Sequence, residues 1–181
     1  ILTGVNAPQV LGRHLHGQPT ITLKKLLYQS NIFMQLKEMG LRVTNANVYR
    51  DHYLQQLSNP TDRKTRPSAS TVACLAAQLP FRTVEDLSNG NGVYHDITNR
   101  ILIESGYDVP LTKPEEAADR LLKIVANNDF TFFEYFMTDI VGHKQDREKS
   151  EEVLESLDRF VGHIDKFLNY NEALVILTSD H

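Results

Sequence analysis

Residues 130–177 constrain the fold more than any other part of the chain. The apolar residues between positions 153 and 168 keep the spacing of one face of a helix. An aromatic run, residues 130–136, precedes this helix, and a continuous apolar run, residues 173–177, follows it. A short apolar run is typical of a strand buried on both faces, as in a parallel sheet. Strand, helix and strand in this order predict a βαβ unit with a right-handed crossover, and therefore an α/β fold.

The rest of the chain predicts short helices joined by polar loops. Helices are expected over residues 23–27, 32–39, 68–78, 93–105 and 114–125, and a short strand over 41–46. Loops are expected over 58–67 and over 1–20, where the alternative is a loop that contains one helical turn. Ser30 is the expected N-cap of the second helix. Thr112-Lys113-Pro114-Glu115 has the pattern of a capping box.

Composition and charge argue against several classes of partner. The chain has 181 residues and a net charge of −4, so no positive field attracts nucleic acid. Cys74 is its only cysteine, which prevents a disulfide within the chain and fits a reducing compartment. No apolar run is long enough to cross a bilayer. We therefore expect a cytoplasmic protein without a nucleic-acid or membrane partner, and the sequence does not indicate its oligomeric state.

Two short motifs contain residues that can bind metal. Asp139 and His143 lie just after the aromatic run, with Gly142 to ease a turn between them. Asp180 and His181 directly follow the terminal apolar run. Taken alone, each motif has an ordinary explanation as a helix cap or a solvated histidine. Together they place four ligands beyond the ends of two strands of one βαβ unit, where sites of parallel sheets gather. Carboxylate and imidazole ligands suit Zn or Mn better than Ca.

The order of these motifs resembles that of cofactor-independent phosphoglycerate mutases, a family of the alkaline phosphatase superfamily. Asp139 and His143 in Thr-Asp-Ile-Val-Gly-His are similar to the family's first metal-binding motif, and Asp180-His181 is similar to its second. Residues 2–8, Leu-Thr-Gly-Val-Asn-Ala-Pro, resemble the segment that follows the nucleophile.

The resemblance implies an alkaline-phosphatase-like sandwich of helices around a mostly parallel sheet, incomplete in this chain. Residues 1–20 and 129–181 would belong to the metal-binding catalytic core, and residues 21–128 to a helix-rich part of the core or a lid. The chain opens without Met and stops directly after an apolar run, so we expect a fragment that is inactive by itself.

The implied activity is that of a phosphatase, phosphodiesterase or phosphomutase acting on a small phosphorylated substrate. Two divalent ions, Zn or Mn, would be bound in part by Asp139, His143, Asp180 and His181. The Ser or Thr nucleophile would lie upstream of Ile1. The alternative is a non-catalytic, degenerate relative that acts as a binding or regulatory module. A sulfatase is less favoured, because it would need a modified residue upstream.

Several other residues have both a functional and a structural interpretation. Asn6 is a candidate to bind a phosphate oxygen, and a turn-forming Asn is the alternative. Candidates for a substrate phosphate also include Arg63, Lys64 and Arg66, for which a solvated loop is the alternative. Structural roles are expected for Asp96 at a helix start, Cys74 in the core, and His52 and His163 on helix surfaces, while His14 and His16 are candidates to lie near the site.

Overall fold

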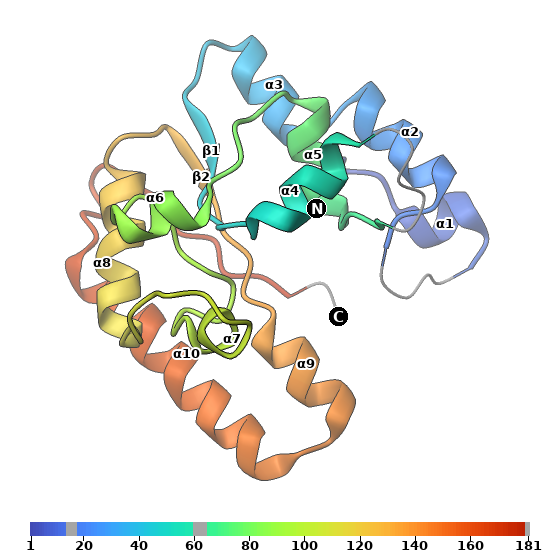
Figure 1. The fold of residues 1–181 in the computed structure, drawn as a ribbon. Coiled ribbons are helices and arrows are strands. Elements are labelled where there is room, and N and C mark those ends of the chain that lie inside the picture. Colours follow the sequence, from blue (N-terminus) through green and yellow to red (C-terminus); the bar gives the residue numbers. More distant parts are fainter. Residues whose placement is uncertain (14–17, 60–64, 180–181) are drawn as a thin grey trace.

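A short parallel sheet lies between two groups of helices (Figure 1). The computed structural model describes residues 1–13, 18–59 and 65–179. Strand β1 (Val43–Asn45) runs parallel to β2 (Phe130–Phe132), with Val43 opposite Phe130 and Asn45 opposite Phe132. The arrangement confirms the expected α/β class, with a two-stranded sheet in the described part of the chain.

The described helices are mostly short. They are α1 (Ala7–Leu11), α2 (Ile21–Gln29), α3 (Ile32–Glu38), α4 (Asp51–Ser58), α5 (Ala69–Ala76), α6 (Val84–Ser88), α7 (Arg100–Glu104), α8 (Pro114–Val125), α9 (Met137–Lys144) and α10 (Arg147–Phe167). None of them combines the length and the apolar character that a membrane span requires. The expected division into a catalytic core and a helix-rich segment stays a prediction.

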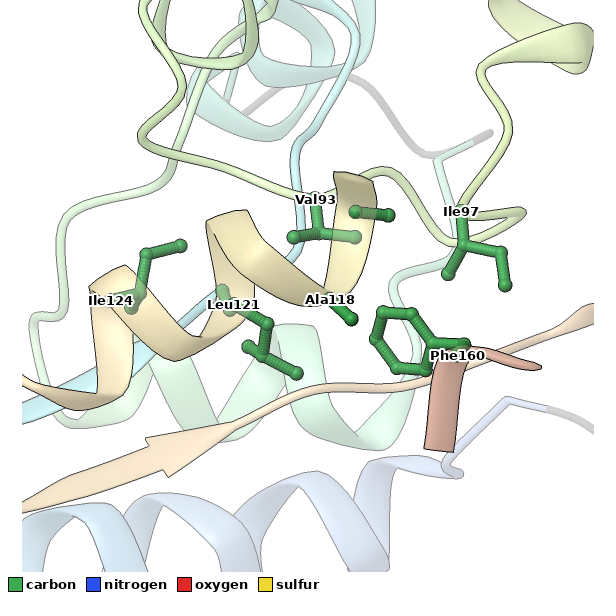
Figure 2. Packing of buried hydrophobic residues seen from close by; sticks show 8 residues of the cluster. Val93, Ile97, Ala118, Leu121, Ile124 and Phe160 are labelled. Carbon is green, nitrogen blue, oxygen red and sulfur yellow. The ribbon is translucent and has the colours of Figure 1, made fainter. Parts of the chain in front are cut away.

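Two hydrophobic clusters cover the sheet. On one side, Phe33 of α3 packs against Phe130 and Phe132, with ring centroids 6.1 and 5.4 Å apart, and α2 and α5 complete this cluster. On the other side, Ala118 and Leu121 of α8 meet Phe160 of α10 (Figure 2). Burial of both sets of side chains is the main force that holds the helices to the strands.

A charged clamp closes the start of the sheet. The Arg42 guanidinium donates to both carboxylate oxygens of Asp129, over 2.8 and 3.1 Å, and the Arg42 backbone N–H donates to the same group. The Asp129 backbone N–H in turn donates a 2.9 Å hydrogen bond to the Arg42 carbonyl. A bidentate pair of this kind is geometrically specific, so it fixes the register in which the two strands enter the sheet.

The N-cap of α3 is Asn31, so the prediction of Ser30 was wrong by one residue. The Asn31 side-chain oxygen accepts from the backbone N–H groups of Phe33 and Met34. Its amide nitrogen donates to the Leu27 and Ala73 carbonyls, at 2.9 and 3.4 Å. Asn31 can join three helices because it has both a donor and an acceptor, which Ser30 cannot offer in the same geometry.

The helix predicted over residues 93–105 is also wrong, because only Arg100–Glu104 is helical. Val93 instead pairs alongside the end of β1, where its N–H donates to the Ala46 carbonyl. Ile97 and Asn99 then take positive φ angles of 55° and 65°, which a helix does not allow. Apolar spacing alone did not reveal this pairing.

The capping box before α8 begins one residue later than predicted. Lys113 is the N-cap, and the Glu116 carboxylate accepts from its backbone N–H at 3.1 Å. The Thr112 hydroxyl is not available as a cap, because it accepts a 2.8 Å bond from the Asn99 side chain. The contact between Asn99 and Thr112 therefore moves the capping box from the predicted N-cap, Thr112, to Lys113.

The two predicted strands of the βαβ unit are shorter or absent. β2 ends at Phe132, and the chain from Phe133 to Phe136 leaves the sheet. Residues 174–177 form no strand, and Leu174 and Ile176 are 83% and 77% exposed. The prediction of a buried strand is wrong for the described structure, because no described strand lies beside this run to pair with it.

One close approach of two loops gives a test of the fold. A Cβ at Gly92 would overlap the Cγ2 atom of Val48, which is buried. We expect Gly92→Ala to lower the free energy of unfolding by about 1–3 kcal/mol, as overpacking does. Gly162→Ala on α10 is the control, because a Cβ there meets nothing within 4 Å. Chemical denaturation measures both, and adding Val48→Ala should recover part of the loss. Additive effects of the two changes would contradict the overlap.

Candidate functional site

The first predicted metal motif lies on α9. Asp139 Oδ1 and His143 Nε2 are 3.2 Å apart, one helical turn from each other. The two groups therefore converge as expected, but through a helix rather than through a turn at Gly142. Their side chains are 52% and 74% exposed, so both offer ligand atoms to a metal at the surface of the helix.

The second motif, Asp180 and His181, lies outside the described residues, so convergence of the two motifs stays a prediction. Within the described part of the chain, no group of three or more His, Cys, Asp and Glu side chains could hold a metal ion. A carboxylate oxygen and an imidazole nitrogen at 3.2 Å are a suitable part of a Zn or Mn site, which needs further ligands to complete it.

A cavity of about 240 Å³ opens beyond the carboxyl ends of β1 and β2. The chain after β1 supplies one wall, and the chain between β2 and α9 supplies another. The cavity is lined by Gln18, Asn47, Val48, Tyr49, Arg50, Tyr53, Arg66, Ser68, Thr71, Tyr94, His95, Glu134 and Phe136. Since Phe136 is the residue from which α9 begins, the cavity lies next to the helix that carries Asp139.

Asn47 joins these two walls. Its side-chain oxygen accepts from the Glu134 N–H at 2.9 Å, and its side-chain nitrogen donates to the Glu134 carbonyl at 2.8 Å. The Asn47 side-chain amide thus takes the place of backbone–backbone hydrogen bonds beyond the ends of β1 and β2. It fixes the chain that leads from β2 to α9.

Among the described residues that line the cavity, two arginines carry positive charge. Arg50 follows β1, and Arg66 lies before α5. Neither guanidinium forms an ion pair with a carboxylate in the described residues, so both have donors to offer an anionic ligand. Of the three basic residues predicted to contact phosphate, Arg66 borders the cavity, and Arg63 and Lys64 lie outside the described residues.

The described cavity lining also contains hydroxyl groups and a carboxylate. Ser70 donates to Glu134 Oε2 at 2.5 Å, and Ser68 contacts the Ser70 and Thr71 hydroxyls at 2.9 Å each. The Tyr49 hydroxyl is 3.2 Å from that of Thr71. Burial raises the pKa of Tyr49 well above its ordinary value, with Cys74 and Glu134 adding to the effect, so Tyr49 keeps its proton at neutral pH.

His95 is a neutral ring in the cavity wall. Its ring lies 4.3 Å from that of Tyr94 and 5.1 Å from that of Phe136, and its Nδ1 is buried without a hydrogen-bond partner in the described structure. Burial lowers the pKa of His95 to about 4, and Arg50 lowers it further, while Asp96 opposes the shift. His95 is therefore uncharged at neutral pH.

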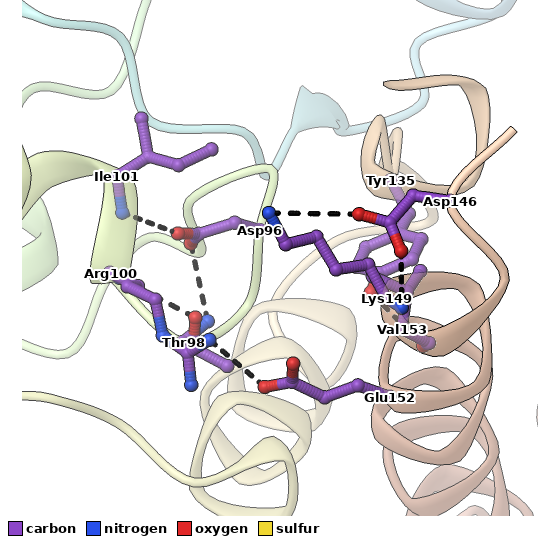
Figure 3. A network of polar contacts seen from close by, with 9 residues as sticks. All are labelled: Asp96, Thr98, Arg100, Ile101, Tyr135, Asp146, Lys149, Glu152 and Val153. Carbon is purple, nitrogen blue, oxygen red and sulfur yellow. Dashed lines mark hydrogen bonds and ion pairs between the residues drawn. The ribbon is translucent and has the colours of Figure 1, made fainter. Parts of the chain in front are cut away.

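Asp96, beside His95, has the structural role expected of it. Its carboxylate accepts from the backbone N–H groups of Thr98, Asn99 and Ile101, at 2.8–3.2 Å, and so supports the start of α7. Figure 3 shows this group beside the Arg100–Glu152 ion pair that links α7 to α10.

The remaining candidates have mixed outcomes. Asn6 is the N-cap of α1 and accepts from the Gln9 N–H at 3.1 Å, and its role toward phosphate stays a prediction. Cys74 is in the core as expected. His163 lies partly exposed on α10, where its side chain is 18% exposed and contacts Asp119 of α8 at 2.7 Å. His52 is exposed on α4, whereas His14 and His16 lie outside the described residues.

Sequence reasoning missed most of the cavity, although one signal was present. Asn47, Tyr49 and Arg50 directly follow the predicted strand 41–46, at the edge of the sheet where sites gather. Glu134 follows β2 in the same way, but the predicted strand 130–136 contained it, so the rule could not select it from the sequence. Nothing in the local pattern marked His95, because the segment around it was interpreted as a helix.

Comparison with known proteins shows a family for most of this chain. The family model described as "Metalloenzyme superfamily" matches residues 54–181, which include α9 and both predicted motifs. No solved structure matches the chain.

Curated relatives are 2,3-bisphosphoglycerate-independent phosphoglycerate mutases. The protein of Mycoplasmopsis synoviae is 28% identical over 162 residues, which are 86% of this chain and 31% of that protein. The protein of Mesomycoplasma hyopneumoniae is 33% identical over 89 residues, 46% of this chain and 18% of that protein. That of Thermococcus gammatolerans is 28% identical over 64 residues, 35% of this chain and 16% of that protein. The chain thus spans less than a third of the length of these relatives.

The lowered pKa of His95 predicts that acid destabilises the fold. The pKa rises from about 4 in the folded protein to about 6.5 on unfolding, so the unfolded state binds more protons between these values. Stability should therefore fall as the pH is lowered through this window, by about 1–3 kcal/mol. Urea unfolding at several pH values measures this loss, which His95→Gln should reduce. His52→Gln, at an exposed histidine, is the control. An equal pH dependence in the wild type and His95→Gln would contradict the assignment.

Proposed function

The chain belongs to the Metalloenzyme superfamily, and from this premise we propose that it is part of a metal-dependent phosphoester enzyme. The proposed activity is that of a phosphatase, phosphodiesterase or phosphomutase with a small phosphorylated substrate. The relatives are phosphoglycerate mutases, which supports a substrate of the phosphoglycerate type. Its Ser or Thr nucleophile would lie upstream of Ile1.

The observation that carries the proposal is the position of the Asp139–His143 pair. The two side chains are 3.2 Å apart on α9, and the helix begins at the wall of a cavity that contains two arginines. Metal ligands beside an anion-binding cavity are what phosphoester chemistry requires. The Asp139–His143 pair alone would support only a metal site, and the cavity alone would support only an anion site.

We propose that Asp139, His143, Asp180 and His181 hold divalent ions, Zn or Mn, as part of a site with two of them. When bound, such ions lower the pKa of a hydroxyl nucleophile and neutralise charge on the leaving oxygen. The helical spacing of Asp139 and His143 holds their ligand atoms in place before a metal arrives, so little side-chain entropy is lost on binding.

The cavity supplies substrate binding. Arg50 and Arg66 would bind the anionic group, because a guanidinium matches phosphate and carboxylate oxygens in pairs. Tyr49 would donate a further hydrogen bond, since it stays protonated. Phe136 and Tyr94 exclude water from one wall, which strengthens these charged contacts.

Loss of one metal ligand tests the proposal. We expect Asp139→Ala in the full-length protein to lower bound Zn or Mn and to abolish turnover of an aryl phosphate ester, because the site loses both charge and geometry. Elemental analysis and kinetics on the same preparation measure the two effects. Asp119→Ala is a matched control, since it removes the carboxylate of another Asp–His contact, at 2.7 Å to His163, away from the motif.

The outcomes separate the two functions considered from the sequence. Lower metal content and lost turnover in Asp139→Ala, with Asp119→Ala unaffected, support the enzyme. A wild-type protein that binds metal and phosphate esters but turns none over would support the non-catalytic binding module instead. Equal metal content in Asp139→Ala and wild type would reject the ligand assignment.

A further inference from the structure

Among the described residues that line the cavity beyond β1 and β2, His95 has the only imidazole ring, and the proposed function gives it no role. We propose that His95 binds the anionic group of a ligand together with Arg50, and that it takes up a proton as the anion enters. The inference rests on the proposed function, since it adds a binding residue and a pH dependence to the same site. It concerns the charge of the occupied cavity and leaves the identity of the ligand open.

The ring of His95 has a fixed place in the cavity wall. Its centroid lies 4.3 Å from that of Tyr94 and 5.1 Å from that of Phe136, and the Phe136 N–H donates to the His95 carbonyl at 3.3 Å. Nδ1 is buried and has no hydrogen-bond partner in the described structure. Nε2 is therefore the ring nitrogen that remains for a ligand in the cavity.

The charged groups around His95 do not provide a counter-ion for a protonated ring. Burial lowers the pKa of His95 and Arg50 lowers it further, while Asp96 and the backbone of His95 itself raise it. The Asp96 oxygens are already occupied, because they accept from three backbone N–H groups at the start of α7. The Glu134 carboxylate, which also lines the cavity, accepts the Ser70 proton. An anion from solution can therefore fill the place of the counter-ion.

The other titratable groups of the described lining bring no negative charge. Burial raises the pKa values of Tyr49, Tyr53 and Tyr94, so all three stay protonated at neutral and mildly acidic pH. Arg66 is a second cation beside Arg50. A ligand anion in this cavity thus meets two guanidinium groups, and its own charge decides whether His95 becomes a third positive group.

An anion beside Arg50 reverses the balance at His95. Its charge offsets the effect of Arg50, and its oxygen accepts a hydrogen bond from Nε2, so the pKa of His95 rises from about 4 in the free protein. If it returns to its ordinary value of about 6.5, the ring is mostly neutral in the free protein and mostly charged in the complex at about pH 5.5. Because the complex then holds more protons than the free protein, affinity rises as the pH falls through this window.

Sulfate tests the coupling, because it keeps both negative charges across the pH range used and any pH dependence therefore belongs to the protein. We expect the full-length protein, with its metal retained, to bind sulfate about tenfold more tightly at about pH 5.5 than at about pH 7.5. Titration calorimetry in two buffers of different ionisation enthalpy counts the protons. Uptake should approach one proton for each sulfate at the lower pH and fall to roughly a tenth of a proton at the higher pH.

Three variants locate the effect. His95→Gln keeps an amide that can bond to an anion but cannot take up a proton, so the pH dependence and the proton uptake should both disappear. His52→Gln, at an exposed histidine of α4, is the matched control and should keep both. Arg50→Gln should weaken sulfate binding at both pH values, because the anion loses a charged partner. The proton count on the wild type needs no substitution, so it decides the matter even if His95→Gln does not fold.

The possible failures are distinguishable. If sulfate brings a proton to His95 but no phosphate ester is turned over, the role of His95 stands and the proposed enzymatic function fails. If an ester is turned over but wild type and His95→Gln take up protons equally, or take up none, the enzymatic function stands and the role of His95 is overturned. Unchanged sulfate affinity in Arg50→Gln, or no sulfate binding by the wild type, would also overturn the inference.

Discussion

The pairing of β1 with β2 is the interaction on which the rest of the structure depends. It joins residues 43–45 to residues 130–132, which are distant in sequence, and the Arg42–Asp129 clamp fixes its register. Because the strands are parallel, both leave the sheet at the same edge. The Asn47 side chain then bonds both backbone groups of Glu134 and continues the pairing beyond the last ladder bond. Without this edge, the arginine of one segment and the carboxylate of the other would not share a cavity.

The sequence predicted the α/β class and the helices α2, α3, α5, α8 and α10, because those features depend on local spacing, but it did not predict α4, α6 or α9. The long helix α10 is the clearest case, since its apolar residues keep helical spacing from Val153 to Phe167 and the helix packs on α8. Errors arose where a distant partner overrode the local pattern. Val93 pairs with the end of β1, and the Thr112 hydroxyl bonds to Asn99, so neither the helix at 93 nor the cap at 112 formed as expected.

The candidate site also has a part that the sequence predicted and a part that it did not. Asp139 and His143 could be predicted, because a residue type and a spacing are visible in sequence. Their placement on a helix could not, since the aromatic run continues past the point at which β2 ends. The cavity was hidden for a different reason: its lining comes from segments whose contacts are set by tertiary pairing. Tyr49, His95 and Glu134 have no common local signal, and only the parallel edge brings them together.

A cavity of this kind is stabilised from outside rather than by its own groups. Tyr49, Ser70 and Glu134 keep polar atoms away from bulk water, and polar groups in such places cost free energy unless they are hydrogen-bonded. The network meets that requirement through bonds that reach α5 and the chain after β1, and α5 packs in the apolar cluster around Phe33. Packing of the apolar cluster around Phe33 therefore fixes the positions of the polar groups in the cavity. A ligand that enters finds its partners already placed, and the protein loses little conformational entropy when it binds.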